Sequence, residues 1–131
     1  MAHLSIRIDL PPAGQIGPGK AKLLELIGET GSISAAGRAL DMSYRRAWLL
    51  VDAMNHIFKQ PVVATMLGGK AGGGAQLTPF GREVLAHYRR LEAKATAACK
   101  AQLAALDAAL SKPATAAGAA RPIPGDPDAA E

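Results

Sequence analysis

The chain has 131 residues, of which 49% are hydrophobic and only 4% aromatic, so we expect one domain with a modest aliphatic core. The single cysteine excludes an intramolecular disulfide, and no apolar run is long enough to cross a bilayer. The net charge of +4 is uneven: residues 1–100 hold 13 basic and 7 acidic side chains, whereas residues 101–131 hold 2 and 4. We therefore expect a basic, soluble, cytoplasmic protein whose partner carries negative charge.

The N-terminal segment predicts a strand followed by a helix. Apolar and polar residues alternate over residues 4–10, which is typical of a half-buried strand, and two prolines end the pattern. The glycines and prolines of residues 14–19 predict a loop, and Pro18 suits the first turn of a helix. Leucines at helical spacing continue this helix over residues 20–29, and Gly31 is a suitable end.

Two further helices are predicted, with a tight turn between them. Ser32 or Ser34 can cap a short helix, residues 41–43 form a break, and Ser43 can cap the helix that runs from residue 44 to about residue 58. That last helix is amphipathic, and Arg45 and Leu49 lie opposite its apolar stripe. The stripe consists of Ala47, Leu50, Val51, Met54 and Phe58.

A hairpin and a long helix complete the pattern. Two extended runs, residues 62–67 and 75–78, flank a glycine-rich tip that carries Lys70. Thr78 and Pro79 then predict the start of a helix that continues to about residue 110, which would make it about 45 Å long. A helix that outruns its own core usually packs against another chain, so we expect a homodimer. The residues expected at this contact are Val84, Tyr88, Leu91, Ala95 and Leu106.

The predicted fold class is mainly α with a small β-hairpin, arranged as a winged helix-turn-helix with a long C-terminal dimerisation helix. Residues 1–78 would form the winged helix-turn-helix and residues 79–110 the dimerisation helix. Residues 111–131 are rich in proline and alanine and show no periodicity, so we expect a disordered tail.

This order of elements suits double-stranded DNA. The second helix of a helix-turn-helix enters the major groove, and its N-terminal residues contact the edges of the bases. Here those residues are Ser43, Tyr44, Arg45 and Arg46, and the lysine at the hairpin tip would contact phosphate or the minor groove. The alternative for the arginines alone is an ordinary solvated helix face.

Three stretches resemble the N-terminal DNA-binding domain of ModE-type molybdate-responsive transcriptional regulators, which is related to the LysR-type winged helix. They are GSISAA at residues 31–36, MSYRRAW at 42–48, and the glycine-rich tip followed by LTPFG at 77–81. The resemblance implies a bacterial homodimeric DNA-binding regulator. It also implies that the residues that meet DNA are Ser34, Ser43, Tyr44, Arg45, Arg46 and Lys70.

Other functions are less well supported by the sequence. No β-rich segment follows residue 110, so we expect neither the oxyanion-binding half of such regulators nor molybdate binding by this chain. No catalytic arrangement, cofactor motif or metal-ligand spacing is present, and we expect no enzyme, no cofactor and no metal site. Cys99 would be a small apolar residue where two helices pair, or a redox-sensitive cross-link. The alternative function is a protein-interaction module in which the long helix and tail recruit a partner.

Overall fold

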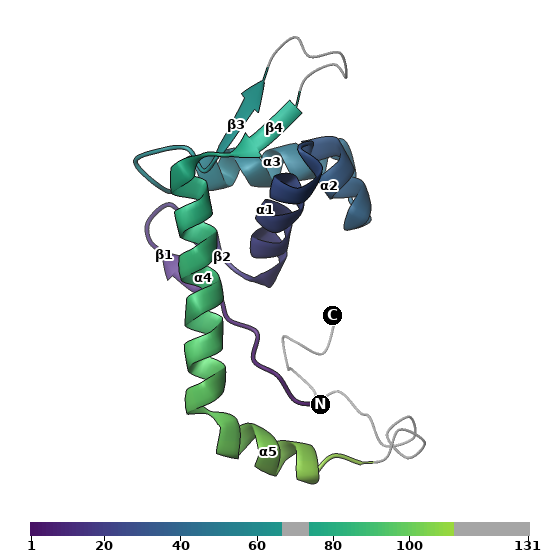
Figure 1. The fold of residues 1–131 in the computed structure, drawn as a ribbon, viewed down its shortest axis with the longest axis vertical. Helices are drawn as coiled ribbons and strands as arrows, with labels where there is room; N and C mark the ends of the chain where they lie inside the picture. The colour runs from purple at the N-terminus through teal and green to yellow at the C-terminus, as the bar shows by residue number, and fades with distance from the viewer. Residues whose placement is uncertain (67–73, 112–131) are drawn as a thin grey trace. The chain divides into compact units, whose positions relative to one another are not determined.

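The computed structural model describes residues 1–66 and 74–111, which form five helices and two small antiparallel hairpins. Contacts divide the chain into one unit of residues 4–98 and a second unit that contains residues 1–3 and 99–111. The elements, labelled in Figure 1, are β1 (Ile8–Leu10), β2 (Gly14–Ile16), α1 (Pro18–Thr30), α2 (Ile33–Ala39), α3 (Tyr44–Asn55), β3 (Val63–Met66), β4 (Gly74–Leu77), α4 (Pro79–Ala98) and α5 (Lys100–Ala108).

The predicted ends of α1 and the predicted serine caps of α2 and α3 are confirmed. Pro18 is the first residue of α1, and Gly31 ends that helix in the left-handed conformation, with φ of 71°. Ser32, rather than Ser34, caps α2: its Oγ accepts a hydrogen bond from the Ala35 N–H at 3.0 Å. Ser43 caps α3 in the same way, accepting from the Arg46 N–H at 3.1 Å.

The structure corrects two predictions: the loop at residues 14–16 and the end of α3. Residues 14–16 form strand β2 rather than a loop, and β2 pairs with β1 so that Ile8 lies opposite Ile16. Because Ile16 is buried, the pairing places an apolar side chain in the interior that a solvated loop would leave exposed. α3 ends at Asn55, three residues before the predicted end at Phe58.

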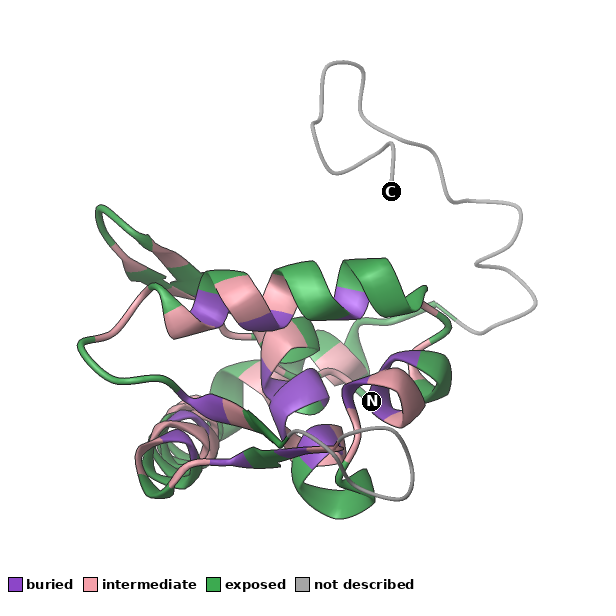
Figure 2. Cartoon of the chain, turned by 90° about the horizontal axis from the view of Figure 1, so that it is seen from above, coloured by how far each residue is buried: buried purple, intermediate pink, exposed green. Residues whose placement is uncertain are grey.

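The main core lies where α1, α2 and α3 meet the hairpin of β3 and β4 (Figure 1). In Figure 2 the buried residues, coloured purple, follow helix sides that face the interior, whereas the outward sides are green. β3 and β4 pair with Val63 opposite Leu77, and both side chains are buried. The core residues are Leu23, Leu24, Ile27, Ile33, Ala36, Ala47, Val51, Met54, Val62, Val63, Ala75 and Leu77.

The predicted single helix over residues 79–110 is divided in two. α4 ends at Ala98, Cys99 has a non-helical conformation with φ of −104° and ψ of 15°, and α5 begins at Lys100. The predicted tail, residues 111–131, lies outside the described residues apart from Ser111.

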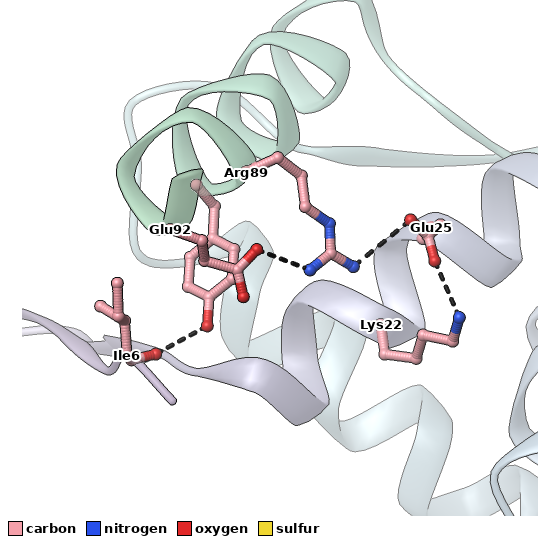
Figure 3. Close-up of polar contacts among 6 residues, drawn as sticks. Ile6, Lys22, Glu25, Arg89 and Glu92 are labelled. Atoms are coloured by element: carbon pink, nitrogen blue, oxygen red, sulfur yellow. Dashed lines mark hydrogen bonds and ion pairs between the residues drawn. The ribbon is translucent and has the colours of Figure 1, made fainter. Parts of the chain in front are cut away.

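The apolar stripe of α4 is partly covered by its own chain, which corrects the expectation that it is reserved for a second copy. Tyr88 is buried beside Ile16 and Ala21, and its hydroxyl donates a hydrogen bond of 2.6 Å to the Ile6 carbonyl (Figure 3). Val84 is half-buried and packs against both apolar clusters. Burial raises the pKa of the Tyr88 hydroxyl, which keeps it a hydrogen-bond donor.

Charged side chains join α1 to α4 beside this tyrosine (Figure 3). Arg89 Nη2 lies 3.3 Å from Glu25 Oε2, and Arg89 Nη1 lies 2.9 Å from Glu92 Oε1. Lys22 approaches Glu25 at 2.9 Å. The hydrogen bond from Lys22, together with the charge of Arg89, holds the pKa of the Glu25 carboxyl below its ordinary value. The pKa of Arg89 is raised, because Glu92 accepts a hydrogen bond from its guanidinium.

Gly81 marks the closest approach between α4 and the rest of the unit. A Cβ atom at this position would lie 1.9 Å from the carbonyl oxygen of Val62. That oxygen belongs to the backbone, so it cannot move away as the end of a flexible side chain could. Only glycine therefore allows α4 to begin this close to the residues that precede β3.

We predict that Gly81→Ala lowers the free energy of unfolding by about 3 kcal/mol or more, because the added methyl group overlaps the Val62 backbone. The control is Gly19→Ala, since a Cβ atom there meets nothing within 4 Å. That change should raise the free energy of unfolding by about 0.5–1 kcal/mol through helix propensity. Urea unfolding followed by circular dichroism measures both, and equal effects of the two substitutions would contradict the close approach.

Candidate nucleic-acid interface

α2, the turn and α3 are packed closely through small residues. A Cβ atom on Gly37 would lie 3.0 Å from the Cβ of Ala47, so glycine and alanine set the short distance between the two helices. The turn is closed by a 3.0 Å hydrogen bond from the Met42 N–H to the Gly37 carbonyl. Asp41 occupies the left-handed region with φ of 56°, which aspartate tolerates better than most non-glycine residues. The predicted helix-turn-helix is therefore built from local backbone contacts.

α3 has distinct inner and outer faces. Ala47, Val51 and Met54 are buried in the core. The exposed residues of its N-terminal half include Tyr44, Arg45, Trp48 and Leu49. Tyr44 retains 58% of its accessible surface. The outer face of α3 is therefore available to a partner along its N-terminal half.

The structure brings four of the predicted DNA-contacting residues together at the start of α3. Ser43, Arg45 and Arg46 line one open hollow of about 340 Å³ together with Leu49 and Leu50, and Tyr44 lies between them in sequence. Ser43 uses a lone pair to cap the helix, which leaves its hydroxyl proton free to donate to a phosphate. This end of α3 thus combines two guanidinium groups, hydroxyl groups and the N-terminal backbone N–H groups of a helix.

Ser34 lies on α2, where its Oγ accepts a 2.8 Å hydrogen bond from Arg38. The predicted contact residue Lys70 lies outside the described residues, in the segment 67–73. Sequence reasoning missed Arg38, an exposed cation in the last turn of α2, although its spacing of four residues from Ser34 is a recognisable signal.

Arg38, Arg45 and Arg46 have no carboxylate within ion-pair distance among residues 1–66 and 74–111. Four of the five ion pairs found in this part of the chain lie elsewhere, and the fifth joins Asp52 to His56 near the end of α3. Positive charge at the start of α3 is therefore not neutralised within the described chain, and it favours an anionic partner.

Asn55 is a second residue that sequence reasoning missed. Its Oδ1 accepts hydrogen bonds from the N–H groups of Val62 and Val63, at 2.8 and 3.1 Å, and its Nδ2 donates to the Val63 carbonyl at 3.1 Å. One amide side chain thus joins the last residue of α3 to the first residue of β3. Asn55 therefore sets the orientation of the hairpin relative to α3.

The remaining predicted dimer residues are accessible. Leu91 is 48% exposed and Ala95 is half-buried on α4, whereas Leu106 is 62% exposed on α5, in the other unit. Leu91 borders an apolar cleft of about 190 Å³ whose lining also includes Ile8 and Leu10. α4 therefore keeps an uncovered apolar area beyond Tyr88.

Other kinds of site are not seen in the described part of the chain. Within residues 1–66 and 74–111, no three His, Cys, Asp or Glu side chains gather as they would around a metal ion. None of the helices in these ranges has the length and apolar character needed to cross a bilayer.

No protein-family model matches the chain, but the chain is similar in sequence to several known proteins. The chain is 51% identical over 79 residues to the molybdenum-pterin-binding protein MopB of Rhodobacter capsulatus, covering 60% of this chain and 29% of MopB. It is 39% identical over 92 residues to the molybdenum transport protein ModE of Azotobacter vinelandii, covering 70% of this chain and 33% of that protein.

The DNA-binding transcriptional dual regulator ModE of Escherichia coli K12 is 37% identical over 71 residues, covering 54% of this chain and 27% of that protein. The chain is homologous to the N-terminal region of ModE proteins. It spans about a third of the length of these relatives. They are named as regulators and as molybdenum-related proteins rather than enzymes, in agreement with the prediction that the ModE-like chain is not an enzyme.

We predict that Asn55→Ala lowers the free energy of unfolding by about 1–3 kcal/mol, because the Val62 and Val63 N–H groups lose their acceptor. His56→Ala is the matched control: its side chain is exposed and its polar contacts within residues 1–66 and 74–111 are with Asp52, so its loss should cost less than about 0.5 kcal/mol. Urea unfolding of both variants measures the difference. A loss for His56→Ala as large as for Asn55→Ala would contradict the role assigned to the amide.

Proposed function

We propose that this ModE-like chain is a sequence-specific, dimeric DNA-binding transcriptional regulator. α3 enters the major groove of the duplex, and the glycine-rich tip between β3 and β4 contacts the backbone or the minor groove. The observation that carries the proposal is the hollow at the start of α3, where Ser43, Arg45 and Arg46 lie together without a neutralising carboxylate in the described chain.

The chemistry of this surface matches that of the major groove. An arginine guanidinium can donate two hydrogen bonds to O6 and N7 of guanine, and hydroxyl groups more often hold phosphates. Arg45 lies on the face of α3 opposite the buried Ala47 and Val51, so it is the principal candidate for base recognition. Ser34, Ser43, Tyr44 and Arg46 would hold the phosphates on either side, together with Arg38. Lys70 would contact phosphate or the minor groove.

The proposed dimer brings two such surfaces to one duplex. The exposed Leu91, the half-buried Ala95 and the neighbouring apolar cleft support a contact between two copies of α4. A two-fold symmetric dimer would bind a roughly palindromic site, with half-sites separated by about one helical turn or a multiple of it. The proposal covers binding to DNA and to a second copy of the chain. It does not include other functions of the relatives, because about two thirds of each relative lies outside the matched region.

We predict that the protein binds duplex DNA with an affinity that falls steeply as salt concentration rises, because phosphate contacts release counterions. Arg45→Ala should weaken binding to selected sequences by about 1–3 kcal/mol and relax the sequence preference. Fluorescence anisotropy with selected and random duplexes, across a salt series, measures both effects.

The control for this experiment is Arg90→Ala, which makes the same change in net charge on an exposed residue of α4. It should leave the preference for selected over random DNA unchanged. Binding that is insensitive to salt, or an equal effect of both substitutions on that preference, would contradict the assignment of α3 as the recognition helix.

Leu91→Asp should convert the dimer into monomers, because a carboxylate at an apolar contact loses its water without gaining a partner. Sedimentation at micromolar concentration measures the change, and DNA affinity should fall with it. Ala93→Asp introduces the same charge on an exposed side of α4 two residues away and should remain dimeric. A monomeric wild-type chain would disprove the proposed dimer.

A further inference from the structure

The outer face of α3 carries exposed apolar side chains among its charged ones. Tyr44, Trp48 and Leu49 retain 58%, 43% and 48% of their accessible surface, all within six consecutive residues. Single exposed apolar residues are ordinary on protein surfaces, but a group of them on one helix marks a surface for binding. A partner that binds α3 would therefore meet apolar side chains as well as positive charge.

Leu49 is the member of this group that lies beside the arginines. It lines the same hollow as Ser43, Arg45 and Arg46, one helical turn beyond Arg45. Its neighbour Leu50 packs against the hydrophobic core, whereas Leu49 is not part of either apolar cluster among the described residues. Leu49 therefore contributes to the outer surface rather than to the core.

Only one base presents an apolar group in the major groove of DNA, since the C5-methyl group belongs to thymine alone. We propose that Leu49 is a specificity-determining residue that contacts a thymine C5-methyl group beside the base contacted by Arg45. This inference rests on the proposed function, because it requires α3 to lie in the major groove.

The geometry of helix and duplex limits where that thymine lies. Four residues of α-helix rise by about 6 Å, and stacked base pairs are separated by about 3.4 Å. The methyl group contacted by Leu49 should therefore lie one or two base pairs from the base contacted by Arg45. Its burial against a leucine side chain is favourable because both groups leave water.

The test compares duplexes that differ only in the C5-methyl groups of thymine. Duplexes are first selected from a random pool with the wild-type protein and are then prepared with either thymine or uracil, which lacks the C5-methyl group. The wild type should bind the uracil form about fourfold more weakly for each methyl group contacted. Leu49→Ala should bind the two forms equally.

Leu110→Ala is the matched control, because Leu110 is also an exposed leucine, with 64% of its surface accessible, but it lies after α5. The ratio of the affinities for the two duplexes should therefore stay at the wild-type value. Circular dichroism checks that Leu49→Ala is folded, which we expect for an exposed position, and Leu49→Gln provides a second variant of similar length.

The outcomes separate this inference from the proposed function. If the wild type shows no salt-dependent binding to duplex DNA, both the proposed function and this inference are wrong. Equal wild-type affinity for thymine and uracil duplexes would overturn the inference and leave DNA binding in place. A preference for thymine that survives in Leu49→Ala, or that Trp48→Ala removes instead, would also overturn the assignment to Leu49.

Discussion

The backbone of Val62 is the point on which the arrangement of α3, the hairpin and α4 depends. Its N–H group donates to Asn55 at the end of α3, and its carbonyl accepts a 3.0 Å hydrogen bond from the Thr78 N–H before α4. The same carbonyl lies against Gly81, where no larger residue fits. Because Val62 itself is fully buried, these backbone groups have no water to replace a lost partner, and the contacts must form together.

Thr78 extends this constraint along the chain. Its hydroxyl donates to the Pro61 carbonyl at 2.8 Å and accepts from the Gly81 N–H at 2.8 Å, so it caps α4 and holds the residue before Val62. On the other side of the hairpin, the Ala75 N–H donates to the Gly31 carbonyl, which joins β4 to the end of α1. The base of the hairpin is therefore tied to three helices, and a partner that contacts both hairpin and α3 meets a pre-arranged surface.

The sequence predicts features that depend on neighbouring residues and misses those that depend on distant ones. The caps of α2 and α3 follow from serine and helical periodicity, and the same periodicity places Arg45 and Leu49 opposite the core. Asn55 could not be assigned its role, because its partners are backbone groups seven and eight residues away. The hydroxyl of Tyr88 is bonded to Ile6, 82 residues earlier in the chain, so local patterns do not reveal that this side chain is covered. The break at Cys99 lies in an alanine-rich run without glycine or proline, so the sequence contains no signal for it.

The separation of the two faces of α3 has a consequence for how such a protein can change. The contacts that hold the helix come from its inner side and its end: Ala47 against Gly37, Met54 in the core and Asn55 on the hairpin. None of them involves Arg45 or Leu49, which face outward. The outer residues can therefore be exchanged with little cost in folding, so under the proposed function one stable scaffold would serve different DNA sequences through a few substitutions.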